Sequence, residues 1–121
     1  MNSRLKAAPK GPVEEVAKGA SSISVIIPFL DEKDTLEKLV DDTADVLTKT
    51  NREFEIILVD DGSSDGTTQL ATQLASSHPK VKLISFSRNF GKAAALSAGF
   101  TNAVGDIFIT MDADYQDDPK E

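Results

Sequence analysis

The chain has 121 residues and no cysteine, and its formal net charge is −7; this length suffices for one small domain with its own core. The negative charge argues against nucleic acid as a partner, and no apolar run approaches the roughly 18–20 residues of a membrane helix. Without cysteine there is no disulfide or thiol chemistry, which fits a cytoplasmic location.

The first part of the chain is predicted to be a flexible tail, residues 1–22. It shows little apolar periodicity and contains Pro9, Gly11, Pro12 and Gly19, a composition typical of segments without a packed core.

The rest of the chain alternates between strand and helix patterns. Short runs rich in β-forming residues predict strands, and apolar positions at helical spacing predict helices. Short crossovers of this kind force parallel strands with right-handed connections, so we expect an α/β fold in the order β-α-β-α-β-α-β. The predicted strands are 23–27, 54–59, 81–86 and 107–111, and the predicted helices are 34–50, 67–78 and 93–103.

The first helix carries both a start signal and a buried face. Asp34 with Glu37 three residues later has the spacing of a capping box, with Asp in place of the usual Ser or Thr. One face of this helix is apolar and is predicted to pack on the sheet. Its members are Leu36, Leu39, Val40 and Leu47.

Two strands are predicted to be buried. The run 54–59 is apolar almost throughout, as in a parallel sheet covered on both faces. The run 107–111 is short and rich in β-formers, and we expect it to be a buried strand as well.

Polar clusters follow the carboxyl ends of all four predicted strands. In a parallel α/β sheet, ligands bind at this edge, near the point where the strand order reverses. The convergence predicts a binding site there. The clusters are Asp31-Glu32, Asp60-Asp61, Arg88-Asn89 and Asp112-Ala113-Asp114.

The last cluster suggests a metal site. In an extended segment, Asp112 and Asp114 point the same way, and two such carboxylates repel unless a cation lies between them. Mg2+ and Mn2+ take oxygen ligands and often bridge one or two carboxylates to phosphate. The alternative is a solvated acidic loop after a core strand.

The acids after the first two strands have two interpretations each. Asp60 or Asp61 could accept hydrogen bonds from a base or a ribose hydroxyl, or both could be turn and cap acids, with Asp65 as a further cap. The same alternatives hold for Asp31 and Glu32, with capping favoured for Asp31.

Positive residues lie before the third helix. Arg88 and Lys92 oppose the helix dipole there, which favours an anion at this position; the alternative is an ion pair with one of the acids. His78, the only histidine, is expected to lie at a helix C-terminus. A Ser/His/Asp or Cys/His triad is therefore excluded at the site.

Four segments in order resemble the family 2 glycosyltransferases. They read SVIIP at 24–28, ILVDDGSSDGT at 57–67, SRNFGK at 87–92 and MDADYQDDP at 111–119. The last is similar to the polyprenyl-phosphate branch, which includes dolichyl-phosphate mannose synthase and undecaprenyl-phosphate sugar transferases. The family usually has an aromatic residue at the position of Leu30 and Asn at that of Asp31.

The resemblance implies a Rossmann-like GT-A fold and an inverting transfer of sugar from a UDP- or GDP-sugar to a polyprenyl phosphate. Residues 23–121 would be the N-terminal, nucleotide-binding part of that domain, truncated before the acceptor half. Membrane association would then come only through the missing part or a partner. The expected location is the cytoplasm or the cytoplasmic face of a membrane.

The resemblance also assigns roles to residues. Asp114 and Gln116 would hold Mg2+ or Mn2+ against the donor diphosphate, with Asp114 as the catalytic residue. The segment after the first strand would line the base and ribose pocket, Val59 and Asp61 would contact the base, and Asp112 would reach the ribose or diphosphate. The predicted donor-binding residues are Pro28, Leu30, Glu32, Val59, Asp61, Arg88, Lys92, Asp112 and Ala113.

Two other functions remain open at this point. The chain could be a non-catalytic nucleotide-binding module that has lost sugar transfer. It could also be a structural remnant whose open sheet edge pairs with another chain.

Overall fold

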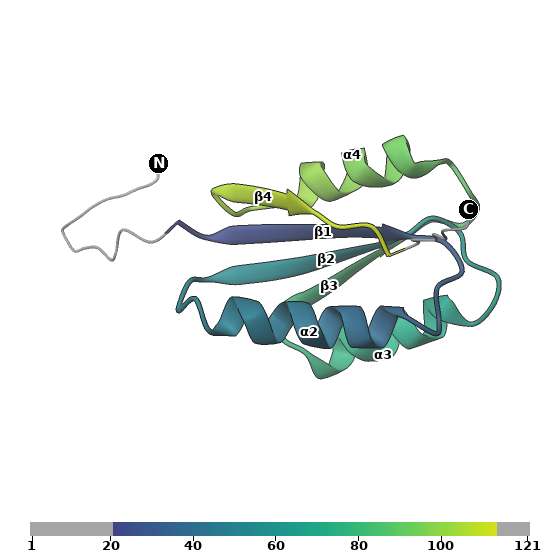
Figure 1. Cartoon of the computed structure of the whole chain (residues 1–121). Coiled ribbons are helices and arrows are strands. Elements are labelled where there is room, and N and C mark those ends of the chain that lie inside the picture. Colours follow the sequence, from purple (N-terminus) through teal and green to yellow (C-terminus); the bar gives the residue numbers. More distant parts are fainter. Residues whose placement is uncertain (1–20, 114–121) are drawn as a thin grey trace, which may run out of the picture.

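The computed structural model describes residues 21–113, in which parallel strands and helices alternate (Figure 1). All three strand pairings are parallel, which confirms the predicted α/β order. Within these residues, no helix has the length and apolarity needed to cross a bilayer. The elements are β1 Ile23–Phe29, α2 Leu36–Thr48, β2 Phe54–Asp60, α3 Thr67–Ser77, β3 Val81–Ser85, α4 Lys92–Asn102 and β4 Ile107–Thr110.

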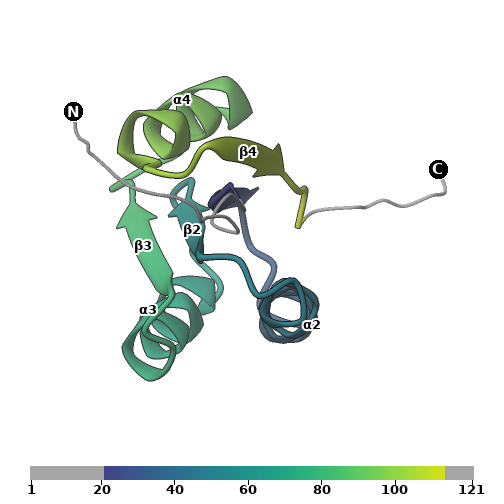
Figure 2. The same cartoon turned by 90° about the vertical axis from the view of Figure 1, so that its left-hand side faces the viewer.

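The sheet has the strand order β3-β2-β1-β4. Helices α2 and α3 cover one face of the sheet and α4 covers the other (Figures 1 and 2). The chain steps from β1 to β2 to β3 in one direction and then crosses back to place β4 on the other side of β1. Because right-handed connections fix the face on which each helix lies, this reversal puts the switch point of the fold between β1 and β4.

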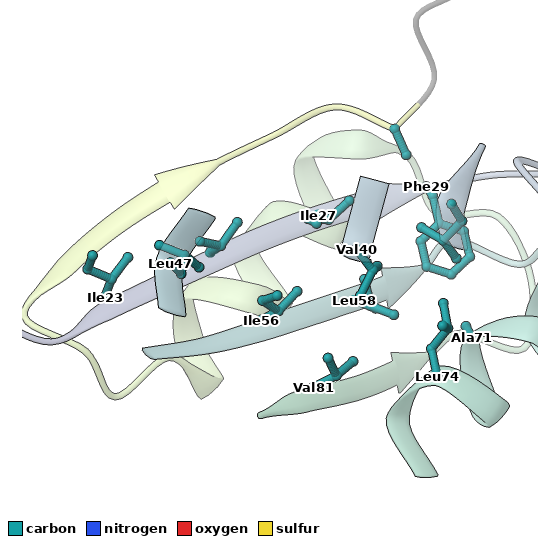
Figure 3. Close-up of a cluster of buried hydrophobic side chains, with 13 residues drawn as sticks. Ile23, Ile27, Phe29, Val40, Leu47, Ile56, Leu58, Ala71, Leu74 and Val81 are labelled. Atoms are coloured by element: carbon teal, nitrogen blue, oxygen red, sulfur yellow. The ribbon is translucent and has the colours of Figure 1, made fainter. Parts of the chain in front are cut away.

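The core has two parts because the side chains of a strand alternate between the two faces of the sheet. The larger part lies between the sheet and helices α2 and α3 (Figure 3), and the smaller part lies under α4. Both faces of β1 and β2 are therefore buried, as predicted for β2. The larger part includes Val25, Ile27, Leu36, Val40, Leu47, Ile56 and Leu58, and the smaller part is Ile26, Ile57, Val59 and Ala95.

The predicted capping box at the start of α2 is wrong. The helix begins at Leu36, and no side chain caps its N-terminus. Instead, the backbone oxygen of Glu32 accepts hydrogen bonds from the amides of Thr35 (3.2 Å) and Leu36 (3.0 Å), while the Thr35 hydroxyl donates to the Glu32 carboxylate at 3.1 Å. A tight turn thus satisfies the first amide of the helix, that of Leu36, and Asp34 does not take the role predicted for it.

The prediction that β4 is buried is also wrong. Its apolar side chains remain exposed, with exposed fractions of 38% for Ile107, 47% for Phe108 and 40% for Ile109. The reason is its place in the sheet: β4 is an edge strand that pairs only with β1 among the described residues. On one face, Phe108 stacks on Phe100 of α4 with ring centroids 5.8 Å apart.

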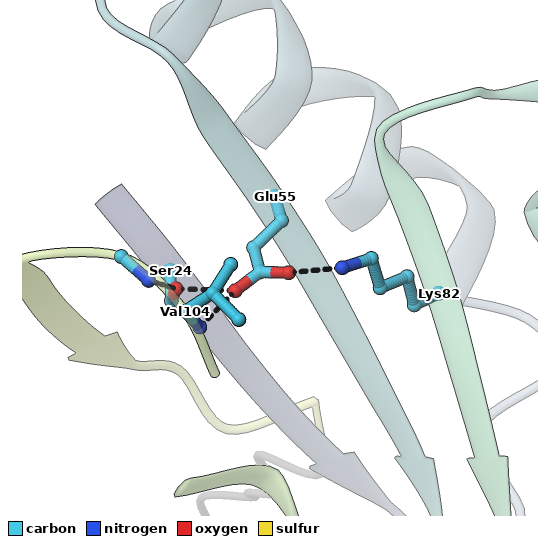
Figure 4. Close-up of polar contacts among 5 residues, drawn as sticks. Ser24, Glu55, Lys82 and Val104 are labelled. Carbon is cyan, nitrogen blue, oxygen red and sulfur yellow. Dashed lines mark hydrogen bonds and ion pairs between the residues drawn. The ribbon is translucent and has the colours of Figure 1, made fainter. Parts of the chain in front are cut away.

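A buried carboxylate, Glu55 of β2, lies at the amino end of the sheet. It accepts hydrogen bonds from Lys82 Nζ at 2.6 Å, the Ser24 hydroxyl at 2.5 Å and the Val104 amide at 2.7 Å (Figure 4). Desolvation raises the pKa of Glu55, but the bonds from Lys82, Ser24 and Val104 together outweigh it, so the pKa lies below its ordinary value. Glu55 is therefore ionised at neutral pH inside the fold.

Replacing this carboxylate should change how stability depends on pH. We expect Glu55→Gln to lower the free energy of unfolding by about 1–3 kcal/mol near neutral pH. A lowered folded-state pKa stabilises the fold above the unfolded-state pKa, and this contribution disappears as the pH falls through the folded-state value. The difference between the two proteins should therefore shrink below the ordinary pKa of 4.5. Urea unfolding across the acid range measures it, and a constant difference would contradict this assignment.

Candidate functional site

A cavity of about 200 Å3 lies at the carboxyl end of the sheet. It is formed by the end of β1, the acid after β2, the start of α4 and Asp112, two residues after β4. This is the switch point between β1 and β4, where parallel α/β sheets bind ligands. The residues that line it are Pro28, Phe29, Leu30, Asp61, Asn89, Gly91, Lys92, Ala95 and Asp112.

Asp61 organises one wall of the cavity. Its side chain is buried, and its carboxylate accepts hydrogen bonds from Asn89 Nδ2 (3.0 Å), the Phe90 amide (2.8 Å) and the Gly91 amide (3.1 Å). Its own amide donates to the backbone oxygen of Phe29 at 2.9 Å. Asp61 therefore ties the ends of β1 and β2 to the loop that precedes α4.

Asp60 has a different role, although it is the neighbouring residue. Its side chain is fully buried and accepts hydrogen bonds from the Ser63 amide (2.8 Å), the Thr68 hydroxyl and the Ser85 hydroxyl (3.5 Å). These contacts hold the loop after β2 and the first turn of α3. Asp60 is thus a turn acid, and only Asp61 of the pair lines the cavity.

The prediction that Asp31 caps a helix is wrong. Asp31 lies in the left-handed region (φ 55°) and bonds across to the loop after β2: its amide donates to Ser63 Oγ at 2.9 Å, and its carboxylate accepts from the Ser64 amide at 2.7 Å. Asp65 does act at a helix start, because it accepts from the amide of Thr67 at 3.0 Å. The Thr67 hydroxyl bond is the main cause that lowers the pKa of Asp65.

The loop after β2 also touches the loop before α4 through Gly62. A Cβ on this glycine would lie 2.4 Å from the carbonyl carbon of Arg88 and 2.6 Å from the amide nitrogen of Asn89, and its φ is +88°. Only glycine fits this contact without a shift of backbone. The two loops that flank Asp61 are thus packed against each other.

Lys92 and Asp112 join the start of α4 to the end of β4. Lys92 Nζ lies 2.5 Å from Asp112 Oδ1, and both side chains are about half exposed. The sequence left an anion site and an ion pair as alternatives for Lys92, and this structure contains the ion pair. Arg88 makes a different contact: its guanidinium lies over the Phe90 ring, 4.5 Å from the centroid.

Five of the predicted donor-binding residues line the cavity, and their binding roles stay predictions. Four others do not line it. The side chains of Val59 and Ala113 are fully buried in the two core clusters, while Glu32 and Arg88 belong to loops beside the cavity. The residues that line it are Pro28, Leu30, Asp61, Lys92 and Asp112.

Four residues of the cavity wall were absent from the predicted site. Asn89 and Gly91 belong to a segment that the sequence singled out, but their bonds to Asp61 join positions 28 and 30 residues apart. Phe29 is buried at the end of β1, and Ala95 lies one turn inside α4. Nothing in the local pattern distinguishes these two from ordinary core residues.

The described residues alone do not form a metal centre. Between residues 21 and 113, no group of three or more His, Cys, Asp or Glu side chains could hold a metal ion. The cavity presents the carboxylates of Asp61 and Asp112, and both already have nitrogen partners. The predicted ligands Asp114 and Gln116 lie outside the described residues.

Comparison with protein families identifies one model that covers most of the chain. Residues 24–121 match the family described as Glycosyl transferase family 2. The match includes all four motif segments, together with the acids that follow β4.

Relatives with named activities are undecaprenyl-phosphate 4-deoxy-4-formamido-L-arabinose transferases. The enzyme of Pectobacterium atrosepticum is 43% identical over 101 residues, which are 83% of this chain and 31% of the relative. That of Klebsiella pneumoniae is 39% identical over 100 residues, 82% of this chain and 31% of the relative. The chain therefore spans about a third of the length of these relatives.

Two solved structures share the fold. The mannosyltransferase PcManGT from Pyrobaculum calidifontis, in complex with GDP-Man and Mn2+, has a TM-score of 0.68 and 27% identity, covering 87% of this chain and 31% of that one. Glucosyl-3-phosphoglycerate synthase from Mycobacterium tuberculosis was solved in complex with Mn2+, UDP and phosphoglyceric acid. It has a TM-score of 0.63 and 28% identity, and the match covers 81% of this chain and 34% of that one. These likenesses confirm the predicted GT-A fold.

Proposed function

The chain belongs to glycosyl transferase family 2, as its motifs predicted, and on that basis we propose that it binds a nucleoside-diphosphate sugar in the cavity between β1 and β4. In the complete reaction, the sugar passes with inversion to a polyprenyl phosphate, and this chain supplies the donor side. The observation that carries the proposal is the cavity itself, which brings segments from all four motifs to the switch point.

The described walls suit the nucleoside end of such a donor. Pro28 and Leu30 offer apolar surface to a base, and Asp61 supplies a buried carboxylate beside them. The volume of about 200 Å3 is below the roughly 300–1,000 Å3 of sites that enclose a drug-sized ligand. It therefore accommodates part of the donor.

The charges suit the diphosphate. Lys92 is the first residue of α4 and lies at the helix N-terminus, where the helix dipole and free amides favour an anion. Its partner Asp112 directly follows Met111 at the end of β4 and precedes the predicted metal ligands. A donor diphosphate would be held between the start of α4 and the end of β4.

The chemistry requires little from the protein beyond position and charge. An oxygen of the acceptor phosphate forms the new bond to the anomeric carbon while the bond from that carbon to the donor diphosphate breaks, and the electron pair leaves with the nucleoside diphosphate. The acceptor phosphate is already ionised, so no strong base is needed. A divalent cation on Asp114 and Gln116, Mg2+ or Mn2+, would stabilise the charge of the leaving group.

A lipid acceptor would put the reaction at a membrane surface, and a nucleotide donor would put it on the cytoplasmic side. The relatives support this choice of acceptor, because their names specify undecaprenyl phosphate. The two structural neighbours were solved with GDP-Man and with UDP, so both nucleotides need to be tested.

Calorimetric titration of UDP and GDP, each with and without Mn2+, tests donor binding. We expect one nucleotide to bind in a metal-dependent way, and Asp114→Ala to weaken that binding by about tenfold or more, because it removes a predicted metal ligand. Asp42→Ala is the matched control: it removes an exposed carboxylate of α2 that forms an ion pair with Lys38 at 2.6 Å. Its affinity should equal that of the unmodified chain.

A folded chain that binds neither nucleotide under any of these conditions would contradict the proposed function. Equal loss of affinity in Asp114→Ala and Asp42→Ala would contradict the assignment of Asp114, because the effect would then follow net charge rather than a metal site.

The exposed edge of β4 favours a second candidate, association with a second copy of this chain. The strand is Ile107–Thr110, which carries no charged residue to protect the edge. Beside it, Ile109 and Met111 form an apolar groove with Val46 of α2, about 310 Å3 in volume. An added strand would bury these side chains.

Sedimentation over a range of protein concentrations tests this association. We expect a dimer to form with rising concentration, and Ile109→Lys to weaken it by about tenfold or more, because it would place a charge in the apolar groove that the second copy covers. Val104→Lys places the same charge on an apolar side chain that is 77% exposed and outside β4, and should change association little. A monomer at every concentration would contradict this candidate.

A further inference from the structure

The chain that enters β4 is anchored at the amino end of the sheet, remote from the cavity. Two consecutive amides provide the anchor: Val104 N donates to Glu55 Oε2 at 2.7 Å, and Gly105 N donates to Ser24 Oγ at 2.8 Å. The Ser24 hydroxyl in turn donates to the same Glu55 oxygen at 2.5 Å. Figure 4 shows Glu55 between these groups and Lys82.

The carboxylate at the centre of this anchor is buried, and both of its oxygens have hydrogen-bond partners. The side chain of Glu55 is only 8% exposed, and its other oxygen accepts from Lys82 Nζ at 2.6 Å. A buried carboxylate is tolerated when its oxygens are satisfied in this way. Gly105 is part of the fit, because a Cβ there would lie 2.6 Å from Ser24 Oγ and 2.8 Å from the Ser24 amide nitrogen.

Ser22 and Asp106 also hold the entry to β4: the Ser22 amide and hydroxyl donate to the Asp106 carboxylate at 3.2 and 3.3 Å, and the Asp106 amide donates to the backbone oxygen of Ser22 at 2.9 Å. The strand itself has four residues, pairs only with β1 within the part of the chain that the structure describes, and is exposed on both faces. Register is weakly specified in such a strand, and a slip of one residue moves the chain by about 3.3 Å and turns every side chain to the opposite face. The entry to β4 therefore determines where its carboxyl end arrives.

That carboxyl end carries the acids of the site. Asp112 meets Lys92 at 2.5 Å and lines the cavity, and Ala113 is packed in the core. Asp114 follows directly in the sequence. An error in the register of β4 would displace Asp112 from Lys92 and Ala113 from the core.

We propose that Glu55 is a positioning residue for the donor site: through Val104, Ser24 and Gly105 it sets the register of β4 together with the Ser22–Asp106 contacts, and so holds Asp112 at the ligand edge. This role rests on the proposed function for its link to the donor. The hold on β4 itself can be tested without any ligand.

The first experiment measures amide hydrogen exchange by NMR in the whole chain. Exchange of Ile107 and Met111, whose amides donate to Ser22 and Ile26 of the β1 side, reports on β4. In Glu55→Ala we expect these two amides to exchange about tenfold faster or more, with no comparable change at Phe86, whose amide bonds to Asp60 at the far edge. Ser24→Ala is a milder change that should speed the same two amides. It serves as the test if Glu55→Ala does not fold.

Two matched variants separate position from charge. Glu55→Gln keeps an oxygen that can accept from Val104 and Ser24, and Lys82 can turn to solvent because its side chain is 55% exposed. Any faster exchange that follows from its lower overall stability should therefore be no greater at β4 than at Phe86. Glu53→Ala removes a carboxylate at the same end of the sheet. The Glu53 side chain is 86% exposed and pairs with Lys80, so its removal should not change the exchange of the β4 amides.

The second experiment repeats the nucleotide titration with Mn2+ on these variants. Affinity should fall by about tenfold or more in Glu55→Ala and Ser24→Ala and be retained in Glu55→Gln and Glu53→Ala. Unchanged exchange of β4 in a folded Glu55→Ala or Ser24→Ala chain would overturn the anchor. Faster exchange with unchanged nucleotide affinity would overturn the positioning role.

Failure of the proposed function gives a different result. An unmodified chain that binds no nucleotide would contradict donor binding and remove the link between Glu55 and the donor. The exchange data would still decide whether Glu55 holds β4.

Discussion

The reversal of strand order between β1 and β4 is the constraint on which the site depends. Right-handed crossovers place α2 and α3 on one face of the sheet and α4 on the other (Figure 2). The helices therefore diverge at the boundary between β1 and β4, and the carboxyl ends of the strands open there instead of being covered. The cavity lies at this point, between Pro28 of β1, Lys92 of α4 and Asp112 after β4.

Carboxylates hold helix α4 and strand β4 in place at both ends of the sheet. Asp61 binds the loop before α4, Asp112 binds the first residue of α4, and Glu55 binds the chain between α4 and β4. Two of these contacts line the ligand edge and the third lies at the opposite end of the sheet. An edge strand as exposed as β4 derives little stability from packing, so polar contacts at its ends determine its position.

Much of this arrangement is predictable from sequence, because its signals are local. The alternation of apolar runs and turn residues predicts the elements, and the clusters after each strand predict the ligand edge. Other features depend on distant partners. The apolar run of β4 does not show that the strand lies at an edge, and the choice between Asp60 and Asp61 depends on bonds to Thr68 and to the Phe90 amide. The cap predicted at Asp34 fails because the helix begins only at Leu36, after a turn in which the backbone oxygen of Glu32 accepts from the amides of Thr35 and Leu36.

Mapping of amide chemical shifts during titration with UDP and with GDP, in the presence of Mg2+, tests the central claim most directly. Binding at the switch point predicts the largest shift changes at Leu30, Gly91 and Lys92 around the cavity, and much smaller changes at Lys80 at the amino end of the sheet. The largest changes at the amino end, or no changes with either nucleotide in a folded chain, would contradict a donor site at the boundary between β1 and β4.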